Sequence, residues 1–157
     1  MKSYELQPTY DNIFDTFIED SIGRDRSLYW FIEIINSIED SCSIALEGHW
    51  GSGKTFFVKQ VKMILDVLNH NLKNTDKENS ESIISTWDTL DKDSNVNWQP
   101  QVSVYYDAWA NDNDEEPLLS LVYQIIKSIS DDYSFKKGAD CLRVVGGIID
   151  FFLINKV

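Results

Sequence analysis

The sequence has 157 residues, of which 43% are apolar and 13% aromatic, enough for one domain with a hydrophobic core. A net charge of −12 and a pI near 4.4 argue against a nucleic-acid-binding surface, because phosphate contacts need clustered lysine and arginine. Cys42 and Cys141 show no metal-ligand spacing, so we expect reduced thiols in a cytoplasmic protein.

The first part of the chain predicts a lead-in segment and a helix. Residues 1–23 are expected to be extended or to form a short helix with a small apolar face, and Gly23 ends that pattern. They hold no apolar run, so no secretory signal is expected. A helix from about Asp25 to Asp40 is predicted by apolar residues on one side, namely Leu28, Phe31, Ile32, Ile35 and Ile38.

The next segment fits the phosphate-loop pattern G-x-x-x-x-G-K-[ST] at every fixed position, as Gly48-His49-Trp50-Gly51-Ser52-Gly53-Lys54-Thr55. Glycines let the backbone adopt positive φ and approach phosphates closely, and successive amide groups then form an anion-binding nest. The pattern predicts that Lys54 reaches the β- and γ-phosphates of a nucleotide, and that the Thr55 hydroxyl holds Mg²⁺.

The flanking sequence gives this motif the expected context. Residues 42–47 alternate apolar and smaller side chains, which predicts a short strand before the loop. Apolar residues then recur at helical spacing to about Leu72. The order of strand, loop and helix predicts an α/β fold with a parallel sheet flanked by helices; the alternative is a chance match in a glycine-rich turn.

The remainder of the chain predicts a polar excursion and further elements. Residues 73–100 are polar and turn-rich, so we expect a surface excursion with one short helix within a single domain of residues 1–157. Residues 101–106 predict a second strand, and a helix follows with Pro117 in its first turn. With only two recognisable strands, the sheet is expected to be incomplete.

The last apolar segment predicts a helix from Phe135 to Ile154, weakened by the pair Gly146-Gly147. Arg143 and Asp150 interrupt it, and it is shorter than the roughly 20 residues that a membrane-spanning helix needs. We therefore expect a packed or interfacial helix, and membrane association stays open as the alternative.

Asp107 lies at the end of the second predicted strand, after Tyr105-Tyr106. An aspartate in this position resembles the acidic residue that positions Mg²⁺ through water in phosphate-loop enzymes. The alternative is that Asp107 begins a turn or caps the segment that follows.

Three pieces of the chain, in order, resemble the KAP family of P-loop NTPases across roughly residues 10–130. The first is Ser21-Ile22-Gly23-Arg24 before an amphipathic helix. The second is the tryptophan-bearing loop from residue 44 to residue 55. The third is Tyr106-Asp107-Ala108-Trp109, which is similar to the family's Phe-Asn-Ala-Trp strand ending.

The resemblance implies a role for each matching residue. Gly48, Gly53, Lys54 and Thr55 are implied on the phosphates and Mg²⁺, with Asp107 and Trp109 beside the site. Asp107 stands where the family usually has asparagine, which leaves its role as a metal ligand open.

Three further residues have alternative interpretations. Arg24 would contact the base or sugar of the nucleotide, or form a surface salt bridge. Trp50 would belong to the binding loop or pack against its outer side. His49 occupies a variable loop position, and we expect it to be structural or solvent-facing.

The resemblance also has a gap. KAP proteins carry a later apolar strand that ends in paired acids, and nothing between Asp114 and Val157 reads as such a strand. The chain therefore looks like the N-terminal part of a KAP domain, and a water-activating residue is not identified.

The function predicted from these observations is Mg-ATP binding, with hydrolysis dependent on further sequence or a partner. The alternatives are a non-catalytic, nucleotide-dependent interaction module and a small-molecule kinase; the kinase is disfavoured because the chain has few arginines. An incomplete sheet would be covered by further chain, a second copy or a membrane-bound partner, which would place the protein in the cytoplasm or at the inner face of a membrane.

Overall fold

The protein is described by a computed structural model that covers residues 6–69, 77–91, 103–112 and 117–132. The chain divides into two compact units, Met1–His70 with Asn74–Gln101, and Asn71–Lys73 with Val102–Val157. The predicted helix from Phe135 to Ile154 lies outside the described residues.

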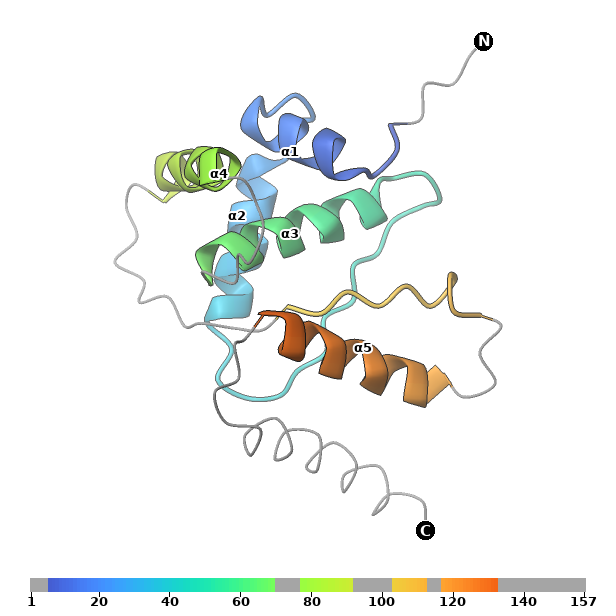
Figure 1. The fold of residues 1–157 in the computed structure, drawn as a ribbon. Helices are drawn as coiled ribbons and strands as arrows, with labels where there is room; N and C mark the ends of the chain where they lie inside the picture. The colour runs from blue at the N-terminus through green and yellow to red at the C-terminus, as the bar shows by residue number, and fades with distance from the viewer. Residues whose placement is uncertain (1–5, 70–76, 92–102, 113–116, 133–157) are drawn as a thin grey trace. The chain divides into compact units, whose positions relative to one another are not determined.

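The described part of the first unit is a cluster of helices around one central helix (Figure 1). The helices are α1 (Tyr10–Ile18), α2 (Asp25–Asn36), α3 (Lys54–Leu68) and α4 (Lys77–Leu90). α3 contacts α1, α2 and α4, and α4 also contacts α1 and α2. The core includes five apolar side chains with no exposed surface: Phe17, Leu28, Ile32, Ile64 and Ile83.

α3 occupies the centre because its sequence is apolar on most sides. Eight of its 15 residues are buried, and they include Phe56, Phe57, Val61 and Ile64. The one polar residue among the eight is Gln60, whose Nε2 donates to Ile13 O at 3.2 Å and to Thr16 Oγ1 at 3.1 Å. These bonds attach α1 to α3, because a buried amide must find partners inside the protein.

The predictions for α1 and α2 agree with the structure in position, whereas the predicted surface excursion contains a longer and more buried helix than expected. α1 begins after Thr9, whose hydroxyl accepts from Asn12 N at 3.4 Å as an N-cap. α2 begins at the predicted Asp25. In the segment predicted as a polar excursion, α4 is a 14-residue helix that buries Ile83 and Trp87.

The described part of the second unit consists of residues 103–112 and α5 (Pro117–Asp132). Pro117 is the first residue of α5, where a missing N–H group is tolerated because it would have no partner in the helix.

The prediction of an α/β fold with a parallel sheet is wrong for the described residues, which form five helices and no strand. In residues 42–47 the apolar side chains Ile44 and Leu46 are 47% and 39% exposed. Alternating apolar residues favour an extended chain, but a strand needs backbone partners supplied by another segment. The described parts of the chain also contain no helix long and apolar enough to cross a bilayer.

Candidate functional site

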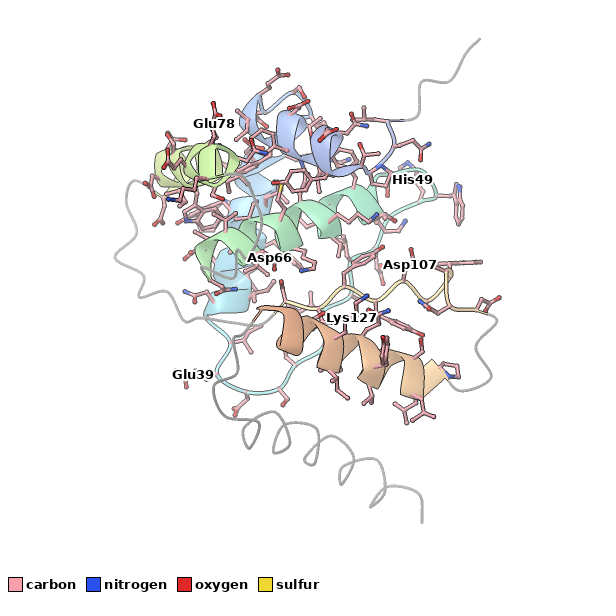
Figure 2. The ribbon with its side chains drawn as sticks, viewed as in Figure 1. Glu39, His49, Asp66, Glu78, Asp107 and Lys127 are labelled. Carbon is pink, nitrogen blue, oxygen red and sulfur yellow. The ribbon has the colours of Figure 1, made fainter. Side chains whose placement is uncertain are left out.

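The glycine-rich segment forms a compact loop that leads directly into α3, with His49 near its start (Figure 2). Ser52 N donates to His49 O at 3.2 Å and closes a four-residue turn. Gly51 is the third residue of this turn and has φ +77°, which side-chain-bearing residues rarely adopt. Gly53 has φ +81° and is the N-cap of α3. The two glycines therefore set the path of the loop.

Lys54 ties the end of the loop back to its beginning. Its Nζ donates to Gly48 O at 2.7 Å and to His49 O at 3.0 Å. A Cβ atom at Gly48 would lie 2.7 Å from Ser52 Oγ, so a larger residue there would displace the Ser52 side chain. The lysine ammonium is thereby held against the loop, as a cation that binds phosphate should be.

The N-terminus of α3 provides the second requirement of an anion site. Gly53 offers no side chain to cap the first amide groups of the helix, and the first turn contains no acidic residue. Helix N-termini carry a partial positive charge and amide groups that point at a ligand. Thr55 is exposed in this first turn. The segment thus suits a phosphate group by backbone conformation, cation and helix dipole.

Arg24 reaches the same loop from the segment before α2. Its Nη2 donates to Ser52 O at 2.8 Å, and its Nη1 lies 3.5 Å from Gly53 O. Within the described residues Arg24 forms no ion pair, so the predicted surface salt bridge is not observed. Its contact with a nucleotide base or sugar stays a prediction.

A comparison with protein families matches residues 27–143 to the KAP family P-loop domain. The chain belongs to this family. No curated protein and no solved structure matches the chain significantly. The match confirms the resemblance and supports nucleotide binding of the NTPase type. It begins after Arg24, which therefore lies outside the KAP match.

His49 and Trp50 both have exposed side chains in this KAP chain, and that of Trp50 is 89% exposed. The loop uses the backbone carbonyl of His49, as described above, and its imidazole forms no hydrogen bond with the described part of the chain. These exposures agree with the solvent-facing alternative for His49. Both interpretations of Trp50, as part of the binding loop or as packed against its outer side, stay predictions.

Asp107 begins a turn in the second unit, where Figure 2 labels it. Its Oδ1 accepts from Trp109 N at 3.1 Å and from Ala110 N at 3.2 Å. Burial raises the pKa of the Tyr105 hydroxyl, and the Asp107 carboxylate, 3.5 Å from that hydroxyl, adds to the effect. The turn alternative is thus observed, while a role of Asp107 as a metal ligand stays a prediction.

A buried carboxylate beside Arg24 was not predicted from the sequence. Asp25 is 6% exposed, and burial, followed by the nearby Asp20 carboxylate, raises its pKa to about 7. Asp25 N also donates to Asp20 Oδ1 at 3.3 Å. The described residues contain no group of three or more His, Cys, Asp or Glu residues placed to hold a metal. Asp20 and Asp25 lie at the corner between α1 and α2 (residues 19–25), and the charge of Asp25 at the start of an apolar helix pattern was the available signal in the sequence.

Proposed function

We propose that this chain binds a nucleoside triphosphate, ATP, together with Mg²⁺, through the loop of residues 48–55. The observation that carries the proposal is the conformation of the loop: two glycines with positive φ lead to an uncapped helix, and Lys54 Nζ is held on Gly48 O and His49 O. This combination fits a phosphate chain because amide groups and one cation share its negative charge.

The residues of the loop fit Mg²⁺ only at one position. Thr55 would hold the ion through its hydroxyl, since it is exposed on the first turn of α3. Mg²⁺ supplies neutralisation of phosphate charge when it is bound. A role of Asp107 as a further Mg²⁺ ligand is a separate part of this proposal that rests on its position in the sequence alone.

We propose further that the chain alone turns ATP over slowly. Phosphoryl transfer usually needs an arginine near the transferred phosphate. The sequence has three arginines, Arg24, Arg26 and Arg143, and the guanidinium of Arg24 is engaged by loop carbonyls. A partner or further sequence would supply the missing group, and the non-catalytic interaction module remains the second candidate function. Binding without phosphate release would favour the module.

Calorimetric titration of Mg-ATP into wild type and Lys54→Ala tests binding. Loss of a charge-assisted bond to phosphate corresponds to a fall in affinity of about 10- to 100-fold. Lys62→Ala is the matched control, because Lys62 lies on the same helix in an ion pair with Asp66 at 2.7 Å. Wild-type affinity in Lys54→Ala, or no binding by wild type, would overturn the proposal.

A further inference from the structure

We propose that Arg24 is a positioning residue that holds the phosphate loop in its binding conformation without touching the nucleotide. The inference rests on the proposed function. Arg24 lies 28 and 29 residues before the two carbonyls that its guanidinium approaches, so this is a tertiary contact. The family match begins at residue 27 and assigns Arg24 no role.

Because the peptide group is planar, a contact from Arg24 to a loop carbonyl also sets the direction of the next amide group. In a trans peptide the C=O bond of one residue and the N–H bond of the next point in opposite directions. When Arg24 holds the carbonyls of Ser52 and Gly53, it therefore turns the amides of Gly53 and Lys54 away from itself. These two amides lie at the start of α3, where an anion binds.

Gly53 shows that the approach is close. A Cβ atom on this residue would lie 2.9 Å from Arg24 Nη1 and 3.4 Å from Nη2. The carbonyl of Gly53 also accepts from Phe57 N at 2.9 Å, which is the first backbone bond of α3. The guanidinium and the helix thus hold the same peptide group from two directions.

The backbone of Arg24 is attached to the core of the first unit. Leu28 N donates to Arg24 O at 3.0 Å, and the Leu28 side chain has no exposed surface. Gly23, with φ +66°, turns the chain immediately before Arg24, and its N–H group donates to Asp20 O at 2.9 Å. Arg24 is therefore fixed by its backbone, unlike an arginine on a free surface.

A fixed loop binds phosphate more tightly than a free one. Glycine-rich chain loses much conformational freedom when it is ordered, and this cost falls on the binding step unless the loop is ordered beforehand. Hydrogen bonds from a guanidinium to carbonyls are charge-assisted and stronger than neutral ones. Because Arg24 already orders the loop in the ligand-free protein, this loss of conformational entropy no longer weakens nucleotide binding.

The test compares two ligands, Mg-ATP and inorganic tripolyphosphate with Mg²⁺, by calorimetry on full-length chains. Arg24→Ala should weaken both ligands by the same factor, about tenfold, because loop amides contact phosphate and not the base. Arg24→Lys should fall between this variant and wild type, since one ammonium does not reproduce the fork of two donors. Arg26→Ala is the control, an exposed arginine two residues away, and should bind as wild type does.

The outcomes separate this inference from the proposed function. If wild type binds neither ligand, the proposed function fails and the inference fails with it. If wild type binds, Lys54→Ala does not, and Arg24→Ala binds as wild type, only the inference is overturned. If Arg24→Ala loses ATP but keeps tripolyphosphate, Arg24 contacts the base or sugar, and the inference is again overturned.

An NMR measurement without ligand covers the case in which Arg24→Ala folds poorly. In the milder Arg24→Lys variant the amide resonances of Gly53 and Lys54 should shift, while those of the Asp107 turn stay in place. Unchanged resonances for both amides would contradict the positioning role.

Discussion

The phosphate loop and the Asp107 turn are both tight turns after segments predicted as strands, yet they are held in different ways. The Asp107 turn is held by its own residues: Asp107 Oδ1 accepts from Trp109 N and Ala110 N, and Asn111 Nδ2 donates to Asp107 O at 2.7 Å. The end of the phosphate loop is held by Arg24, from another part of the sequence. The conformation of the Asp107 turn is therefore determined by its own residues. The end of the phosphate loop depends in addition on Arg24, which lies at the corner between α1 and α2.

The strongest test of this difference is Gly53→Ala measured against Gly51→Ala. Both changes force a side chain into positive φ, at a cost of about 1–2 kcal/mol each. Only at Gly53 would the new Cβ meet Arg24, while at Gly51 nothing lies within 4 Å. We expect Gly53→Ala to bind Mg-ATP about tenfold more weakly than Gly51→Ala.

The same pair in an Arg24→Ala background provides the control, because the additional cost at Gly53 should then disappear. Equal affinities of the two alanine variants in the wild-type background would show that the loop does not depend on Arg24.

A second test measures how the stability of the α1–α2 corner depends on pH. Asp25 has a pKa raised to about 7 in the folded protein, from an ordinary value of 3.8, so the folded chain binds one proton more than the unfolded chain between these values. The contribution of Asp25 to the free energy of unfolding is fully present below pH 3.8 and is lost as the pH rises to about 7. We expect wild-type stability to fall between pH 5 and pH 7, by up to about 1.4 kcal/mol per pH unit.

Asp25→Asn removes the titrating group and should flatten this part of the profile, as measured by urea unfolding at a series of pH values. Glu19, Asp20 and Arg26 line the same cavity as Asp25 and stay unchanged in the variant. Identical pH profiles for the two proteins would contradict the assignment to Asp25.

The smallest effect is expected from Asp107→Asn. The asparagine carbonyl keeps the bonds to Trp109 N and Ala110 N, so stability should change by less than about 0.5 kcal/mol. If Asp107 serves only the turn, Mg-ATP affinity should also stay unchanged. A loss of affinity that appears only when Mg²⁺ is present would identify Asp107 as a metal ligand.

The parts predicted from sequence are those that depend on neighbouring residues. Helical spacing of apolar residues predicted α2, α3 and α5, and Pro117 predicted the start of α5. The positive φ of Gly53 falls at a fixed glycine of the loop motif, whereas that of Gly51 falls at a variable position and agrees with the general preference for glycine in turns. The strand predictions failed because the alternation around Ile44 and Leu46 says nothing about which segment would pair with them, and both residues are exposed.

Contacts between residues far apart in the chain could not be predicted from the sequence for the same reason. A single arginine after a glycine shows no pattern that distinguishes a carbonyl clamp from a nucleotide contact, and only folding brings Arg24 to Ser52 O. The hydrogen bonds by which Gln60 attaches α1 to α3 could likewise not be predicted from the sequence.

One guanidinium joins the α1–α2 corner to the two peptide planes at the start of α3. Rotation of that corner would therefore turn the planes with it and alter how long a triphosphate stays bound. If the loop binds a triphosphate as proposed, a second molecule bound at this corner would change the affinity for the nucleotide without occupying the loop itself.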